Sequence, residues 1–335
     1  MHEVDAPGVS REASADLVAK AHQFARRARA ESTLQGYRKS LRIFAAWCQK
    51  HDRAPLPAST ETIALFLADV AGHYSFGTVT LFCDAVAFVH RLTGEPFDRT
   101  GFRPVLQGIR RTHGSARRRV APIVVADLRA MLGTLPDTLL GKRDRALFLV
   151  GFAGALRCGE LVGLDVGPPA PPGRGFVELD GEGAHIILLR SKTDQVGKGI
   201  SKMLPRGGDP CPVEALEAWL AAAHITAGPV FRFLWPSGRL SSKRLTTKRV
   251  NLIVKQAVYA SARQAGQTEE QARARAHQVS SRSLRAGFVT SAAIANVPTQ
   301  DIAAHVGWAS TRMALTYIRQ VDLTTDNPAQ RVLVS

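Results

Sequence analysis

Apolar side chains recur three and four positions apart along most of the first hundred residues, which is the spacing of one face of an α-helix. The clearest series is Leu34, Tyr37, Leu41, Phe44 and Cys48. It predicts a helix whose start is capped by the hydroxyl of Ser32 or Thr33. We expect this face to pack into a core.

Three further helices are predicted in the same region. One begins near Ser59 or Thr60, the next ends at Gly94, and a short one spans residues 105–111. The apolar positions of the first two are Ile63, Phe66, Leu67 and Val70, then Val79, Phe82, Val86 and Val89. The N-terminal region is therefore expected to be entirely helical.

The pattern changes in the second half of the chain. Helices are expected near residues 125–135 and 142–155, and again from Val213 onward. Between them, short apolar segments bounded by turn residues predict three strands, at residues 176–179, 185–190 and 201–204. We expect a mainly α fold with a small antiparallel β-sheet in the C-terminal domain.

A basic segment divides the chain of 335 residues. Residues 101–120 lack acidic side chains and hold Arg103, Arg110, Arg111, Arg117, Arg118 and Arg119. Gly114, Ser115 and Pro122 break the helical pattern there. We expect a flexible tail over residues 1–10, a helical domain over 11–111, a basic linker over 112–122 and a second domain over 123–335.

The net charge favours a polyanionic partner. Lys and Arg number 44 against 28 Asp and Glu, a formal charge of +16. No apolar run approaches the ~20 residues of a membrane span, and the N-terminus lacks the apolar core of a signal peptide. The four cysteines form no C-x-x-C pair, which favours free thiols over zinc or disulfides. We therefore expect a cytoplasmic protein that binds nucleic acid.

A second basic stretch lies between Glu217 and Glu269, where no acidic residue occurs. Its aromatic residues Phe231, Phe233 and Trp235 are expected in the core. Together with the arginines near the linker, this stretch supplies the candidates for DNA-backbone contacts. They are Arg110, Arg111, Arg117, Arg118, Arg119, Lys243, Arg244, Lys248 and Arg249.

Four short segments of the second domain carry candidate chemistry. The first contains Gly154, Arg157 and Glu160 in the order G-A-L-R-C-G-E-L, and the second is Arg190-Ser191-Lys192-Thr193. The third runs Arg282-Ser283-Leu284-Arg285-Ala286-Gly287. The fourth places Tyr317 nine residues after Trp308.

In this combination and order, the segments resemble those of the tyrosine recombinase (phage integrase) family, and the Trp at position 308 resembles its Cre-like branch. The resemblance covers nearly the whole chain. It implies a C-shaped clamp on duplex DNA, built from a helical SAM-like core-DNA-binding domain and a catalytic domain. It also implies that Tyr317 is the nucleophile and that Arg157, Lys192, Arg285 and Trp308 assist it.

The residue types suit phosphoryl transfer. Arginine forks such as those of Arg157 and Arg285 bind the oxygens of a phosphodiester, and Trp308 offers one N–H donor. Lys192 can protonate the leaving 5′ oxygen, and Glu160 can orient its neighbours. Ser283 is expected to cap the helix of Arg285.

One position departs from the family pattern, because Arg282 stands where the family usually has His. Arginine stays protonated and cannot accept the proton of Tyr317, although it can donate hydrogen bonds to a phosphate. His277 and His305 lie nearby in sequence and are alternative bases. Either would restore the proton acceptor that the pattern lacks.

The resemblance implies a site-specific DNA recombinase that cuts and rejoins strands through a 3′-phosphotyrosyl intermediate and a Holliday junction, without metal, ATP or other cofactor. Its partners would be double-stranded DNA and other copies of the chain, as a tetramer on two DNA sites. The apolar C-terminal segment 331–334 would dock on a neighbouring subunit. Two alternatives stay open: a DNA-binding accessory protein that has lost catalysis, and an enzyme that relaxes or resolves DNA by the same chemistry.

Overall fold

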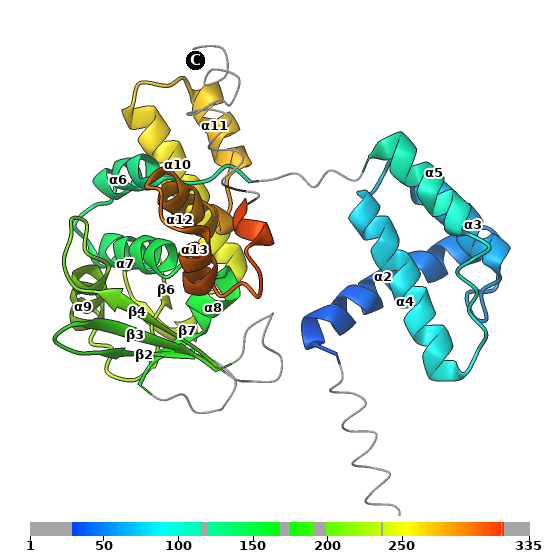
Figure 1. Cartoon of the computed structure of the whole chain (residues 1–335), viewed down its shortest axis with the longest axis horizontal. Helices are drawn as coiled ribbons and strands as arrows, with labels where there is room; N and C mark the ends of the chain where they lie inside the picture. Colours follow the sequence, from blue (N-terminus) through cyan, green and yellow to red (C-terminus); the bar gives the residue numbers. More distant parts are fainter. Residues whose placement is uncertain are drawn as a thin grey trace, which may run out of the picture. The chain divides into compact units, whose positions relative to one another are not determined.

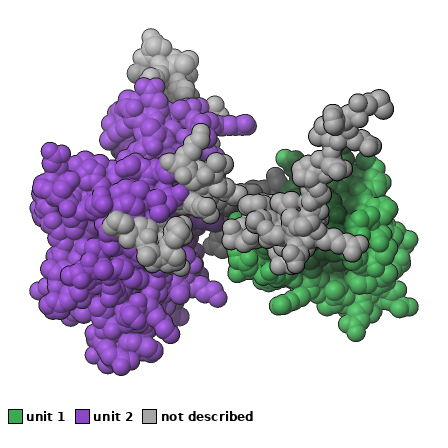
Figure 2. All heavy atoms as spheres, turned by 90° about the horizontal axis from the view of Figure 1, so that it is seen from below, with its two compact units in different colours: residues 1–118 green, residues 119–335 purple. Residues whose placement is uncertain are grey.

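The computed structural model of the chain describes residues 29–114, 120–167, 175–189, 199–235, 237–315 and 317. The chain folds into two compact units, residues 1–118 and 119–335 (Figure 2). Several predicted features lie outside the described residues. They are the tail 1–10, the linker residues Arg117, Arg118 and Arg119, the segment 190–198 with Lys192, and the C-terminal segment 331–334.

The described part of unit 1 is built of helices. They are α2 (Glu31–Lys50), α3 (Thr60–Val70), α4 (Phe76–Thr93) and α5 (Arg103–His113). Ser59 caps α3 by accepting from the Thr62 N–H at 3.1 Å, and Gly94 ends α4 in the left-handed conformation, as predicted. The predicted cap of α2 was wrong: the helix begins at Glu31, so that both candidate hydroxyls fall within its first turn.

Apolar faces of these helices form one core. It contains Phe44, Cys48, Ile63, Phe66, Leu67, Val70, Val79, Phe82, Cys83 and Val86, among others. Phe66 contacts both Phe44 and Phe82 edge to face, with ring centroids 5.0 and 5.3 Å apart. The predicted stripes therefore do pack together, as the three- and four-residue spacing requires.

Unit 2 combines helices with a small sheet. Its helices are α6 (Val125–Gly133), α7 (Leu139–Ala153), α8 (Cys158–Gly163), α9 (Pro212–Ala222), α10 (Thr247–Gln264), α11 (Glu269–Gln278), α12 (Arg282–Ile294) and α13 (Thr299–Val306). Its strands are β1 (Leu164–Val166), β2 (Gly175–Leu179), β3 (Gly183–Leu188), β4 (Ile200–Pro205), β5 (Gly228–Pro229), β6 (Arg232–Leu234) and β7 (Leu240–Arg244). The chain is mainly helical, as expected.

Strands β2, β3 and β4 are the three predicted strands, and neighbouring pairs are antiparallel. The sheet is larger than predicted, because its order is β4-β3-β2-β1-β5. Strand β1 pairs with β2 in the parallel direction, with Leu164 opposite Gly175. The sheet is therefore mixed, which corrects the antiparallel prediction; a separate hairpin joins β6 and β7.

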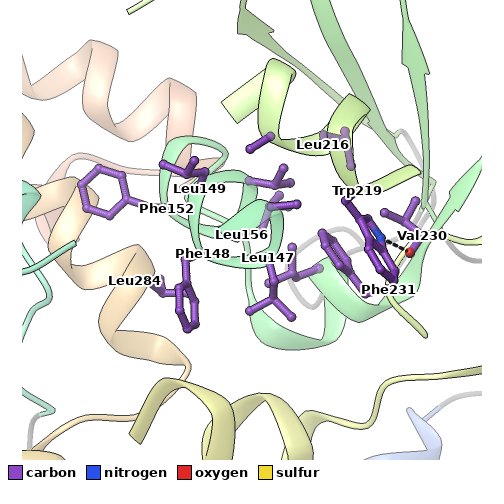
Figure 3. Packing of buried hydrophobic residues seen from close by; sticks show 14 of the residues in the cluster. Leu147, Phe148, Leu149, Phe152, Leu156, Leu216, Trp219, Val230, Phe231 and Leu284 are labelled. Atoms are coloured by element: carbon purple, nitrogen blue, oxygen red, sulfur yellow. Dashed lines mark hydrogen bonds between the residues drawn. The ribbon is translucent and has the colours of Figure 1, made fainter. Parts of the chain in front are cut away.

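Helix α7 is the centre of unit 2. Ten of its fifteen residues are buried, among them the ion-paired Arg143 and Asp144 near its start and the apolar run Ala146–Phe152. Figure 3 shows its side chains meeting Leu284 of α12 on one flank and Leu216 and Trp219 of α9 on another. In Figure 1 the strands β2–β4 lie at one end of the unit and α10 and α11 at the other, with α7 and α12 between them. The C-terminal end of α7 therefore lies among α8, α12 and α13.

Candidate active site

The site is organised by the turn that follows α7. Gly154 ends the helix, and Ala155 adopts a φ of 46° although it carries a side chain. A non-glycine residue in this region costs roughly 1 kcal/mol and persists where the surroundings enforce it. Ala155 is fully buried against Val289, Ile302 and Val306. The turn reverses the chain and brings Arg157 to the start of α8.

Arg157 and Glu160 form a closed pair at the start of α8. The Arg157 backbone N–H donates to Glu160 Oε2 at 2.8 Å, and its guanidinium donates to Oε1 at 2.6 Å. The Glu160 side chain is only 8% exposed, while that of Arg157 is 26% exposed. Glu160 therefore holds both the backbone and the side chain of Arg157.

Arg285 lies one turn inside α12 and is held by the turn after α7. Its Nη1 donates to the Ala155 carbonyl at 2.7 Å, while its Nη2 is buried and has no hydrogen-bond partner among the described residues. Burial, with the charge of Arg157 close by, lowers its pKa to about 10. An unpaired buried guanidinium nitrogen is costly, and an anion would satisfy it.

Gly287 allows α12 to pack directly against the backbone at Ile123. A Cβ at this position would lie 1.7 Å from the Ile123 carbonyl oxygen, so only glycine fits.

The predicted cap of α12 was wrong, because Ser281 is the N-cap residue and Ser283 lies inside the helix. The Ser283 hydroxyl instead accepts from the Ser280 N–H at 3.0 Å.

Trp308 and Tyr317 stack beside Arg285. Their rings are nearly parallel, at 21°, with centroids 5.9 Å apart. The Arg285 guanidinium lies over the Trp308 ring at 5.6 Å from its centroid, a cation–π contact. Both aromatic residues are half-buried against the small cluster that contains Ala155. The structure thus gathers Arg157, Glu160, Arg285, Trp308 and Tyr317 in one place.

Sequence reasoning missed Lys202, which lies in the same place. It is on β4, 6% exposed, and its Nζ donates to the Gly154 carbonyl at 2.7 Å. Burial, with the charges of Arg285 and Arg157 nearby, lowers its pKa to about 8. The signal was the alternation of the strand: Lys202 falls on the buried face with Leu204.

The three remaining candidates are His305, Arg282 and His277. His305 donates from Nε2 to the Ala153 carbonyl at 2.7 Å and stacks on Phe288, and burial lowers its pKa below the ordinary value. Arg282 is exposed at the first position of α12, and His277 is exposed on α11. His305 therefore uses Nε2 to donate to the end of α7.

The basic candidates for backbone contacts divide into two groups. Arg110 and Arg111 are exposed on α5, and Lys243, Lys248 and Arg249 are exposed on unit 2. Arg244 is different, since its guanidinium binds Asp165 at 2.6 Å and the carbonyls of Val162 and Leu164. These bonds use its fork within the protein, which argues against a contact with DNA.

The aromatic residues of the β6–β7 region correct another expectation. Phe231 is fully buried and Phe233 packs against the core, but Trp235 is 46% exposed. Arg239 lies over the Trp235 ring and Arg249 over the Phe233 ring, at 5.6 and 5.0 Å from the centroids. The hairpin therefore presents aromatic and basic groups together at the surface.

Chemically, the gathered residues form an anion site beside a tyrosine. Two guanidinium groups, one with an unused nitrogen, converge with an indole and a phenol. Within the described residues no cluster of His, Cys, Asp and Glu is arranged to hold a metal, and no helix has the length and apolar character of a membrane span.

Comparisons with known proteins agree with this reading of the fold. The chain is 32% identical over 324 residues to the integrase/recombinase XerD homolog of Selenomonas ruminantium, covering 94% of this chain and 89% of that protein. The structure of the Tn1549 transposon integrase in complex with transposon right end DNA aligns with a TM-score of 0.58 at 14% identity, over 94% of this chain and 98% of that one.

Two other solved structures share the fold. A lambda integrase dimer bound to a core site aligns with a TM-score of 0.55 at 14% identity, over 92% of this chain and 77% of that chain. The XerH site-specific recombinase bound to a palindromic difH substrate aligns with 0.53 at 16% identity, over 81% and 72%. The chain matches no protein-family model. From its similarity to the XerD homolog over almost its whole length, the chain belongs to the tyrosine recombinase family of integrases and site-specific recombinases.

Proposed function

We propose that this recombinase cuts and rejoins duplex DNA with Tyr317 as its nucleophile. The observation that carries the proposal is the unpartnered Nη2 of Arg285, buried beside Arg157, Trp308 and Tyr317. A scissile phosphodiester bound there would accept from both arginines and from the Trp308 indole N–H. The phenol of Tyr317 would then stand next to the phosphorus.

The reaction is a pair of transesterifications. The Tyr317 phenol loses its proton to water as its oxygen forms a bond to phosphorus, the bond to the 5′ oxygen breaks, and Lys192 supplies a proton to that oxygen. The 3′-phosphotyrosyl ester conserves the bond energy, so a 5′ hydroxyl of the partner strand can reverse the step and rejoin DNA through a Holliday junction. Arg282 stays protonated and would contact phosphate instead of accepting a proton.

We assign the DNA contacts and the assembly in the same way. Unit 1 would serve as the helical core-DNA-binding domain, corresponding to the predicted domain 11–111, followed by the linker 112–122 and the catalytic domain 123–335. Exposed Arg110, Arg111, Lys243, Lys248 and Arg249 would lie along phosphates, as would the linker residues Arg117, Arg118 and Arg119. Trp308 favours the Cre-like branch and, with it, a tetramer on two DNA sites. The basic charge and the DNA substrate also favour a location at the nucleoid.

A covalent-adduct assay tests the proposal. Protein is mixed with labelled DNA fragments from around its own coding locus, without metal or ATP, and then denatured. Wild type is expected to leave a protein–DNA adduct and Tyr317→Phe none, while both bind the same fragments, because only one hydroxyl is lost. Binding without any adduct in wild type would favour the non-catalytic accessory protein. Adducts whose products are relaxed circles instead of recombinant joints would favour a relaxing enzyme.

A further inference from the structure

Three consecutive carbonyls at the end of α7 each accept a hydrogen bond from a different element. The Ala153 oxygen accepts from His305 of α13, the Gly154 oxygen from Lys202 of β4, and the Ala155 oxygen from Arg285 of α12, each at 2.7 Å. The last carbonyls of a helix have no partner within it and carry the negative end of its dipole. Cationic donors are therefore favoured at this end, and two of the three donors, Lys202 and Arg285, are of this kind.

Lys202 is the least expected of the three donors. Lys202 is only 6% exposed, and removing its charged ammonium group from water costs free energy. An apolar side chain at the same position on the inner face of β4 would avoid that cost. Arg285, Arg157 and Glu160 are the charged groups whose fields reach it, so it is part of the cluster that holds the anion site. A costly buried cation beside an active site suggests a role in function.

We propose that Lys202 is a positioning residue of the recombination reaction. Its ammonium fixes the Gly154 carbonyl and with it the turn in which Ala155 keeps a positive φ. That turn presents the Ala155 carbonyl to Arg285 and sets the start of α8 at Arg157. Lys202 thereby sets the separation and direction of the two guanidinium groups without touching DNA. The inference rests on the proposed function, in which these groups bind the scissile phosphate.

The first test compares Lys202→Met with Lys142→Met, a matched loss of one lysine at the opposite end of α7. On a DNA fragment that wild type cleaves, Lys202→Met is expected to slow single-turnover adduct formation by about 10- to 100-fold, as a small misplacement of catalytic groups does. The Kd for DNA should change by less than about twofold, because Lys202 is buried. Lys142→Met should retain the wild-type rate.

A double-variant cycle separates positioning from general damage to the fold. Arg285→Lys already lacks one of the two forks that Lys202 is proposed to aim and leaves only the placement of Arg157 to lose, so adding Lys202→Met to it should slow the reaction clearly less than it slows wild type. Equal losses in both backgrounds would overturn the inference. So would a Lys202→Met rate within twofold of wild type.

Two further outcomes are decisive. If Lys202→Met does not fold, Lys202→Leu takes its place in the same cycle, since it also lacks the N–H donor to the Gly154 carbonyl, and a wild-type rate for it would overturn the inference. If wild type forms no Tyr317-dependent adduct on DNA that it binds, the proposed function fails and the inference falls with it. An active wild type with an unaffected Lys202→Met refutes the positioning role alone.

Discussion

Arg157 and Arg285 belong to the same site, yet the protein compensates their charges in different ways. Arg157 is bound by a carboxylate, since Glu160 meets both its backbone and its guanidinium. Arg285 is bound by a neutral carbonyl, with a second buried cation, Lys202, on the adjacent carbonyl. The α8 side of the site is therefore close to neutral, whereas the side formed by α12 and β4 carries an excess of positive charge.

This difference suggests a division of labour. A phosphodiester gains negative charge on its non-bridging oxygens during transesterification, and fixed positive groups stabilise that charge most strongly where water is excluded. In the proposed reaction Arg285 would supply most of this stabilisation, because no carboxylate is hydrogen-bonded to it in the described part of the chain. Arg157, which Glu160 holds in place, would mainly fix the orientation of the phosphate.

The largest effect is expected for Arg157→Ala. It removes a phosphate-binding guanidinium and leaves the nearly buried Glu160 carboxylate without its ion-pair partner beside the bound phosphate, so adduct formation should fall by at least about 10³-fold. Adding Glu160→Gln removes the repulsion, and the double variant should react faster than Arg157→Ala alone. Single-turnover rates of the four combinations measure this. If the double variant is no faster than Arg157→Ala alone, the Glu160 charge does not repel the bound phosphate.

Arg285→Lys should have the next largest effect. Lysine keeps the charge but replaces the fork of donors with one point, so Nη1 and Nη2 cannot serve the Ala155 carbonyl and the phosphate together. We expect a rate loss of about 10²-fold with the Kd for DNA little changed. Arg273→Lys, an exposed substitution on α11, is the control. A loss as small as the control's would show that charge alone suffices on this side of the site.

How much of this site the sequence reveals depends on how local each signal is. Arg157, Arg285, Trp308 and Tyr317 lie in short motifs, and the structure gathers them as that pattern suggests. Lys202 has no motif, and only the alternation of β4 indicates that it points inward. Its partner, the Gly154 carbonyl, lies 48 residues away, and no local pattern could supply that pairing.

The errors in the fold have the same origin. Strands β2 to β4 have enough length to show a pattern, but β1 has three residues and β5 two, too few for any periodicity. The parallel pairing of β1 with β2 is fixed by tertiary packing of the surrounding helices, so the mixed sheet was missed. The caps of α2 and α12 were misplaced because several hydroxyl residues stand in a row, and backbone geometry selects among them.

A change in stability with pH should reveal the excess charge on the α12 and β4 side. Lys202 has a pKa of about 8 in the folded chain, against an ordinary value of about 10.5. Between these values the unfolded chain binds more protons, so the free energy of unfolding gains on the order of 3 kcal/mol from this group as pH rises. Below pH 8 that gain is absent.

Comparing wild type with Lys202→Met removes this contribution, together with the smaller effect of the Lys202 charge on the pKa of His305. Denaturant unfolding at pH 7 and pH 10 is expected to give a difference between the two proteins that shifts in favour of wild type at the higher pH. A pH-independent difference would mean that the ammonium is not strongly desolvated.

The smallest effect is expected for Arg282→His, which changes the charge at the start of α12 without touching the turn after α7. Arg282 is exposed, and a histidine there can still donate to an anion while adding a group able to accept a proton. We therefore expect the rate of adduct formation to stay the same or to rise by up to about threefold at pH 7.5. The pH–rate profile should gain a limb near the ordinary pKa of histidine that wild type lacks. A loss comparable to that of Arg285→Lys would instead make Arg282 a third phosphate clamp, and the positive side of the site would then extend from β4 along the first turn of α12.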